Sequence, residues 1–271
     1  MNNIKDIREA VMSSNLSDND KYYWGYMYDL GRSTIVPLLI EQGIFKSGDK
    51  VAEIGSAEGG VLHALAEAGA SEAIGTDIAL ERIQTGELIT KIAGLDVTYS
   101  SHDIIGEEPH AEWQNRYDLV ILRDVIEHLD SAYTALANIR KIMKPGGFLY
   151  VTFPSYYSPF GGHQHTLAGN ALTKLPYIHY FTQGFFEFLI QSGRPQDIEE
   201  VMRLRDIRLT PDKFKKAALE ANLNIYREDY YILRPVFKAK FGLPALKMPA
   251  FLGFPPFNSV FCTESSFILQ K

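Results

Sequence analysis

One ten-residue stretch, VAEIGSAEGG at residues 51–60, limits the fold most strongly, because an apolar run ends abruptly in a group of glycines. The residues before Gly55 predict a buried strand, and the segment after Gly60 predicts a helix. Glycine lets a chain turn sharply and lets a ligand approach the backbone closely. Because open parallel sheets bind ligands at the carboxyl ends of their strands, this stretch predicts a ligand-binding turn in an α/β fold.

The segments that follow alternate between strand and helix patterns as far as residue 155. Four more strands are predicted in EAIGTDI, DVTYSSHDI, YDLVILRD and FLYVTFPS, and the helix before the last strand is expected to close at KPGG. The apolar run in YDLVILRD indicates burial on both faces. This alternation predicts a doubly wound, Rossmann-like parallel sheet. Two closing strands are predicted in NIYREDYYIL and SVFCTESSFILQ.

We expect a single domain over residues 1–271, with two insertions. Residues 156–206 show no clear strand pattern and predict a lid after the fifth strand. The proline-rich residues 234–258 predict an insertion between the sixth and seventh strands. Between the insertions, Thr210 and Pro211 predict the start of a helix, as N-cap and first helical residue.

Composition narrows the choice of partner and compartment. The net charge of −6 argues against nucleic acid, because an acidic surface repels phosphate groups. The one cysteine, Cys262, rules out an internal disulfide and favours the reducing cytoplasm. The charged segment MNNIKDIREA lacks the apolar run of a signal peptide, and no stretch reaches the ~18 apolar residues of a spanning helix. We therefore expect a cytoplasmic protein that acts on a small molecule, without stable membrane insertion, and its oligomeric state stays open.

Acidic residues stand at the ends of the first three predicted strands. Glu53 ends the first, and Asp77 ends the second, where a nucleotide site places an acid for the ribose hydroxyls. Asp103 ends the third and could accept a hydrogen bond from an adenine amino group. The glycine spacing differs from the G-x-G-x-x-G of nicotinamide enzymes, which disfavours that alternative. The three acids together predict a ligand that contains a nucleoside.

The motifs VAEIGSAEGG, GTDI, SHDI, YDLVILRDVIEHLD and KIMKPGGFLYVTFPS resemble, over about residues 45–155, those of class I S-adenosylmethionine-dependent methyltransferases. DVIEHL followed by KPGG is typical of the branch with quinone and small-molecule methyltransferases. The resemblance implies a seven-stranded sheet with a C-terminal antiparallel hairpin, and S-adenosyl-L-methionine as cofactor, with S-adenosyl-L-homocysteine as product. It also implies that residues 1–45 form a helical cap over the cofactor, the alternative being a helix packed on the sheet.

The resemblance also implies how the cofactor is held. Glu53 and the glycine turn would hold the methionine part, Asp77 the ribose, and Asp103 the adenine. The family usually has a glycine where this chain has Ala57, and we expect cofactor binding to survive this change. The implied cofactor-binding residues are Glu53, Gly55, Ser56, Ala57, Gly59, Gly60, Asp77, Ile78, Asp103, Ile104 and Arg123.

Three histidines are the candidate catalytic residues. A sulfonium methyl is already electrophilic, so the enzyme must align a nucleophile and exclude water. A hydroxyl nucleophile is helped by a general base, and histidine suits neutral pH. His128 follows the fourth strand, and His163 and His165 follow the fifth at the same rim, although a helix cap or a surface loop would also explain them. Two histidines without a firm third ligand give a weak metal signal, so we expect no metal site.

Aromatic residues surround the predicted site and favour an acceptor with an apolar or planar part. We expect acceptor contacts from Tyr28, Tyr156, Tyr157 and His163. The aromatic segment 177–188 predicts either a pocket wall or a small helical core under the lid. The expected function is O-methylation of an aromatic, quinone-like or lipid-like metabolite. A sugar or glycan acceptor, and a catalytically silent regulator that binds the cofactor, stay open as alternatives.

Basic residues lie among the aromatic residues of the second insertion. They could contact a membrane surface or an anionic group of a substrate. Because the prolines rule out a continuous amphipathic helix, we expect a structured insertion with solvated lysines instead. The residues concerned are Arg234, Lys238, Lys240 and Lys247.

Overall fold

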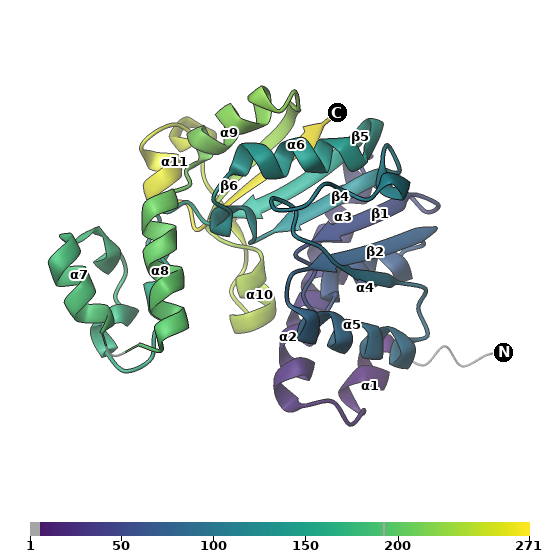
Figure 1. Cartoon of the computed structure of the whole chain (residues 1–271), viewed down its shortest axis with the longest axis horizontal. Coiled ribbons are helices and arrows are strands. Elements are labelled where there is room, and N and C mark those ends of the chain that lie inside the picture. The colour runs from purple at the N-terminus through teal and green to yellow at the C-terminus, as the bar shows by residue number, and fades with distance from the viewer. Residues whose placement is uncertain (1–5, 192) are drawn as a thin grey trace.

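The computed structural model describes residues 6–191 and 193–271. In Figure 1, helices cover both faces of a central twisted sheet, whose strand order is β3-β2-β1-β4-β5-β8-β6-β7. The strands are β1 (Lys50–Ile54), β2 (Glu72–Asp77), β3 (Thr98–Ser101), β4 (Tyr117–Arg123), β5 (Met143–Phe153), β6 (Asn224–Leu233), β7 (Leu246–Lys247) and β8 (Glu264–Gln270).

The first five strands run parallel, and β8 lies antiparallel between β5 and β6. The predicted doubly wound sheet and antiparallel C-terminal pair are therefore confirmed. The predicted count of seven strands is wrong, because β7 of the second insertion adds a short edge strand to β6. The helix that KPGG was predicted to close is α6 (Ala132–Ile142), which ends just before this motif, because Met143 already pairs with Tyr117 in the sheet.

The sheet is buried on both faces, as the apolar run in its central strand predicts. Leu119 and Ile121 of β4 belong to one apolar cluster, and Val120 and Leu122 belong to the other. This alternation follows from the two-residue period of a strand. The cluster that contains Leu119 and Ile121 lies under α2 (Asp18–Leu30), α4 (Gly60–Glu67) and α5 (Leu80–Ala93). The cluster that contains Val120 and Leu122 lies under α6 and α9 (Pro211–Glu220).

The N-terminal segment packs as helices against α4. Its elements are α1 (Ile7–Met12), α2, a π-helical stretch (Gly31–Ile35) and α3 (Val36–Glu41), while residues 1–5 of the predicted cap lie outside the described residues. The Trp24 indole N–H donates to His63 Nδ1 at 2.9 Å, which ties α2 to α4 inside the core. A Cβ at Gly60 would lie 2.6 Å from the Cβ of Met27, so this glycine lets α2 approach the start of α4.

Both predicted insertions are structured. The first contains α7 (Gln183–Ile190) and α8 (Pro195–Ile207), which stand apart from the sheet at the left of Figure 1. Phe186 packs there in a small core with Leu167 and Ile190, so the segment 177–188 contributes to a helical core. Thr210 caps α9, as predicted, because its hydroxyl accepts the N–H of Lys213 at 3.3 Å.

The second insertion contains α10 (Val236–Phe241), β7 and α11 (Phe257–Val260), and α10 lies beside α2. Whether either insertion acts as a lid stays a prediction. Among the described residues, no helix combines the length and the apolar character that crossing a membrane requires.

Candidate functional site

A cleft of about 570 Å³ opens at the carboxyl ends of β1, β2 and β4. It extends from His102 and Asp103 at one end to His128 and Glu200 at the other. Its volume lies within the range of small-molecule sites, and its position is the one where parallel sheets bind ligands. Ten of the eleven predicted cofactor-binding residues line this cleft, and Gly59 does not. A Cβ at Gly59 would lie 2.0 Å from the Tyr99 hydroxyl, so this glycine serves the packing of α4 on β3.

The glycine turn is held by steric and hydrogen-bonding constraints. Gly55 has a φ of 68°, and a Cβ there would lie 2.3 Å from Val125 Cγ2, so only glycine fits. Ala57 has a φ of 48°, in the left-handed region that costs an alanine about 1 kcal/mol. Its N–H donates to Asp77 Oδ2 at 2.9 Å, which fixes the turn against the end of β2.

The end of the cleft near β2 and β3 fits an adenosine group. Asp77 accepts the N–H of Ala79 at 2.8 Å as well as that of Ala57, and these bonds hold its carboxylate at the cleft. Ile78 lines the cleft with 75% of its surface exposed, so it is free to pack on a flat ring. Asp103 accepts the N–H of Ile105 at 3.0 Å and also lines this end.

At the ends of β1 and β4, the cleft contains a buried carboxyl group and a buried guanidinium group. Glu53 is 3% exposed, and burial raises its pKa to about 8, although the charge of Arg123 and the N–H of Leu62 oppose this rise. Arg123 is buried, its guanidinium lies 3.3 Å from Asp124, and its Nε has no hydrogen-bond partner among the described residues. A buried acid and a partly unsatisfied arginine fit a ligand that carries both an ammonium and a carboxylate.

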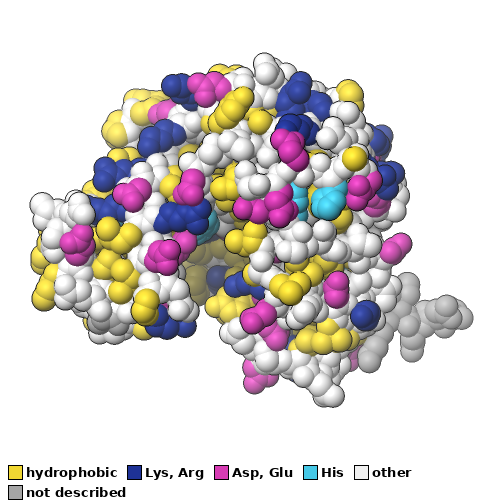
Figure 2. All heavy atoms as spheres, in the orientation of Figure 1, with side chains coloured by type: hydrophobic (Ala, Val, Ile, Leu, Met, Phe, Trp, Pro, Cys, Tyr) yellow, Lys and Arg dark blue, Asp and Glu magenta, His cyan; other side chains and the backbone are white. Residues whose placement is uncertain are grey.

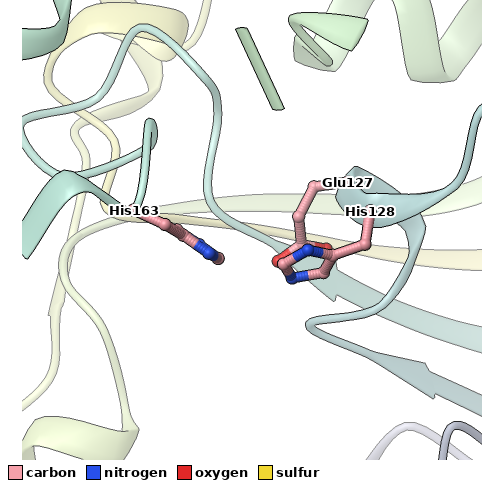
Figure 3. A group of neighbouring side chains, drawn as sticks. All are labelled: Glu127, His128 and His163. Carbon is pink, nitrogen blue, oxygen red and sulfur yellow. The ribbon is translucent and has the colours of Figure 1, made fainter. Parts of the chain in front are cut away.

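Two of the three candidate histidines meet beside the cleft, together with a glutamate (Figure 3). His128 and Glu127 come from the turn after β4, and His163 points toward them from the loop after β5. One ligand atom from each of the three lies within 4.8 Å of the others. His165 lies next along the loop, with its ring centroid 6.1 Å from that of His163.

Burial and neighbouring charges shift the pKa values of Glu127, His128 and His163 in different directions. Burial raises the pKa of Glu127 to about 7, and both its carboxylate oxygens lack a hydrogen-bond partner among the described residues. Burial and the neighbouring histidines lower the pKa of His163 to about 3, so it is neutral at pH 7. Burial alone would lower the pKa of His128, but its hydrogen bond to Glu200 and the charge of Glu127 outweigh burial and raise it.

This group can act chemically in two ways. It can accept a proton, because a carboxyl with a pKa near 7 suits a general base at neutral pH. It also offers a carboxylate and two imidazoles, a donor set that divalent transition metals accept. The expectation of no metal site is not tested by these contacts and stays a prediction.

The three tyrosines that were predicted to contact the acceptor lie outside the cleft. Tyr28 is fully buried, stacks on Trp24 and donates its hydroxyl to Glu67. Tyr156 is buried against His179, and neither Tyr156 nor Tyr157 lines a cavity described here. The N-terminal contribution to the cleft comes instead from the opposite face of α2, through Tyr23, Tyr26 and Met27. The spacing of 3.6 residues per turn separates these two faces, and this period could have identified them from the sequence.

A second cavity of about 450 Å³ lies next to the cleft, between the loop after β5 and α10. Figure 2 shows a recess between the α7–α8 segment and the rest of the molecule. The partition between cleft and cavity consists of two contacting pairs. One pair is His128 with His163, whose ring centroids lie 5.0 Å apart, and the other is Asp124 with Arg234, at 2.6 Å. The cavity is lined by Pro154, Ser158, Phe160, His163, His165, Lys174, Arg234, Val236, Phe237, Lys240, Phe241 and Thr263.

Residues with a strained backbone lie at this partition and at the glycine turn. Seven described residues other than glycine have a positive φ, and three of them are Ala57, Asp124 and His163. Strained residues persist where the surrounding structure holds them, and they cluster at functional sites. Asp124, Glu127 and Arg234 were absent from the predicted site. Asp124 and Glu127 lie within the DVIEHL motif, which could have indicated them, whereas Arg234 was noted only as one of the basic residues of the second insertion.

Comparisons with known proteins agree with this geometry. Residues 23–224 match the family described as "Methyltransferase domain". A ubiquinone biosynthesis O-methyltransferase from Proteus mirabilis (strain HI4320) is 31% identical over 108 residues, which are 40% of this chain and 42% of that protein. A second such enzyme, from Photorhabdus laumondii, is 30% identical over 40% of this chain and 43% of its own length. The chain therefore spans less than half the length of these relatives.

Solved structures share the fold at low sequence identity. An S-adenosylmethionine-dependent methyltransferase from Mesorhizobium loti has a TM-score of 0.54 and 13% identity, over 87% of this chain and 96% of that one. A phosphoethanolamine N-methyltransferase from Haemonchus contortus, solved with S-adenosyl-L-methionine, has a TM-score of 0.56 and 15% identity. That match covers 98% of this chain and 60% of the other.

Proposed function

This chain belongs to the class I S-adenosylmethionine-dependent methyltransferases, and we propose that it methylates a hydroxyl group of a small aromatic, quinone-like or lipid-like molecule. The observation that carries this proposal is the placement of the cleft beside a second cavity that has aromatic side chains in its wall, with His128 and His163 between them. A methyl transfer needs donor and acceptor to meet at such a boundary, away from bulk water. The ubiquinone O-methyltransferases that match part of the chain support the same class of acceptor.

The cofactor supplies an electrophilic methyl group, and the cleft offers contacts for each part of it. Glu53 would meet the ammonium, and Arg123 the carboxylate, of the methionine part. The Asp77 side chain would accept hydrogen bonds from the ribose hydroxyls. Ile78 would pack on the adenine, where its apolar surface is exposed. Tyr26 lines the same cleft from α2 and helps to exclude water.

The acceptor side requires a place for the hydroxyl proton. We assign this role to the group of Glu127, His128 and His163. His163 lines the second cavity and is neutral, so it can accept a hydrogen bond from the acceptor hydroxyl. With a pKa of about 7, Glu127 can then hold the proton. His165, which also lines the cavity, orients the acceptor rather than taking the proton.

The test is methyl transfer from S-adenosyl-L-methionine to a panel of phenols, catechols, hydroquinones and sugars. We expect S-adenosyl-L-homocysteine to form with at least one phenolic acceptor, together with a product whose mass increases by one methylene group. Methylation of sugars alone would replace the proposed acceptor with a glycan. Cofactor binding without transfer to any panel member would favour a catalytically silent regulator and contradict the proposal.

A further inference from the structure

The second cavity has a positive charge that the rest of the chain does not share. Three cationic side chains line it, Lys174, Arg234 and Lys240, and none of its described lining residues is acidic. The whole chain, by contrast, carries a net charge of −6. A concave site of one charge sign concentrates ligands of the opposite sign.

The two lysines of the cavity lack acidic partners. In the described parts of the chain, no Asp or Glu lies within ion-pairing distance of Lys174 or Lys240, whereas Arg234 is paired with Asp124 and Glu264. Lys174 donates to the carbonyl of Leu167 at 2.9 Å. The Lys240 ammonium lies 4.0 Å from the ring centroid of Tyr26. Neither lysine therefore has an acidic partner among the described residues, and Lys240 contacts an aromatic ring rather than being simply solvated as the sequence suggested.

Aromatic side chains form the remaining wall of the cavity. Phe160 lies edge-on to His165, with ring centroids 5.2 Å apart, and Phe237 lies edge-on to Phe241, at 5.6 Å. Phe241 is 66% exposed although it lines the cavity, so it offers an uncovered apolar surface to a ligand. The cavity thus combines unpaired positive charge with surfaces that favour a planar or apolar body.

We propose that this cavity binds a methyl acceptor that carries an anionic group, such as a carboxylate or phosphate, on an aromatic or apolar body. Lys174 and Lys240 bind the anionic group, and the phenylalanines pack on the body. The acceptor hydroxyl then faces His163 at the partition. This inference rests on the proposed function, because it names the acceptor of the same reaction. The contact of Lys240 with Tyr26 places this lysine where the acceptor cavity adjoins the cofactor cleft.

The test uses two probes that differ in charge and little else, 3,4-dihydroxybenzoate and 3,4-dihydroxybenzamide. Calorimetry measures their binding to the chain saturated with S-adenosyl-L-homocysteine, so that no turnover occurs. We expect the benzoate to bind about tenfold more tightly than the benzamide at low ionic strength, as a charge-assisted hydrogen bond implies. Raising the salt concentration should reduce this preference, because salt screens partly exposed charges.

Two variants and a matched control assign the preference to the cavity. Lys174→Gln and Lys240→Gln should each weaken the benzoate severalfold without affecting the benzamide, and the double variant should remove the preference. Lys238→Gln is the control, because Lys238 is exposed on the same helix as Lys240 and does not line the cavity. Thermal unfolding of each variant checks that the fold is intact.

Equal affinities for the two probes would overturn the inference, as would an equal loss of preference in Lys238→Gln. Lysine-dependent binding to anionic phospholipid vesicles, with no preference between the probes, would overturn it in favour of a lipid surface. Failure of S-adenosyl-L-homocysteine to bind would contradict the proposed function instead. The probes would then be compared on the chain alone, where the preference for the benzoate still tests the cavity.

Discussion

Replacing Glu53 by Gln should stabilise the fold and weaken the cofactor site at once. Glu53 is buried at the cleft, where burial raises its pKa from 4.5 to about 8. The folded chain therefore keeps this carboxyl protonated at neutral pH, while the unfolded chain ionises it above pH 4.5. Each pH unit between these two values favours unfolding by about 1.4 kcal/mol.

The free energy of unfolding should therefore differ between the wild type and Glu53→Gln, and this difference should depend on pH. At pH 7 the wild-type chain is about 2.5 pH units above the unfolded pKa and still below the folded one, a cost of about 3 kcal/mol. Glutamine is neutral in both states and can keep the bond that Glu53 accepts from the Leu62 N–H. The variant should thus exceed the wild type by about 3 kcal/mol at pH 7 and match it near pH 4.5.

The same change removes the proposed partner of the cofactor's ammonium. Losing a hydrogen bond to a charged group costs about 1.5–3 kcal/mol, or roughly a tenfold to hundredfold loss in affinity. Urea unfolding at pH 4.5, 5.5 and 7 measures the first effect, and calorimetry with S-adenosyl-L-homocysteine measures the second. A stability gap that does not change with pH would refute the reasoning about burial. Unchanged affinity would refute the role of Glu53 in binding.

The remaining predictions concern the turn, the partition and its chemistry. Asp77→Ala should weaken cofactor binding by ~1–3 kcal/mol, measured by calorimetry, and unchanged affinity would remove Asp77 from the ribose site. His163→Ala should lower kcat strongly with little change in cofactor Kd, and normal turnover would exclude it from catalysis. Ala57→Gly relieves a positive φ, so it should leave stability unchanged or raise it by up to about 1 kcal/mol in urea unfolding. A clear loss of stability would show that the alanine is unstrained. A chelator such as EDTA should leave methyl transfer intact if the group of Glu127, His128 and His163 acts as a base. Activity lost on chelation and restored by a divalent cation would assign a metal to it.

The sequence predicted the parallel sheet, and most of the residues that it assigned to a cofactor site lie together in one cleft, because both depend on local patterns. Strand periodicity identified the five parallel strands, and the acids at the strand ends follow each other in neighbouring positions of the sheet. Asp77 and Asp103 line the cleft for this reason. Residue type alone did not indicate which face of α2 lines the cleft. Tyr28, the predicted contact, is buried in the core, whereas Tyr26, two positions earlier, lines the cleft.

The second cavity could not be predicted, because it exists only through tertiary packing. His163 and Lys240 lie far apart in the sequence and come together when α10 packs beside α2. The short strand β7 was not predicted, for a similar reason. Leu246 and Lys247 form a strand only because the edge of β6 offers unpaired backbone groups.

Calorimetric titration with S-adenosyl-L-methionine, S-adenosyl-L-homocysteine and NAD tests the central claim most directly. The claim is that the cleft between Glu53 and Asp103 is a functional methyl-donor site. Micromolar binding of the first two ligands, weakened in Asp77→Ala and without any binding of NAD, is the predicted result. Binding of NAD in their place, or of none of the three to either the wild type or Ala57→Gly, would contradict the account.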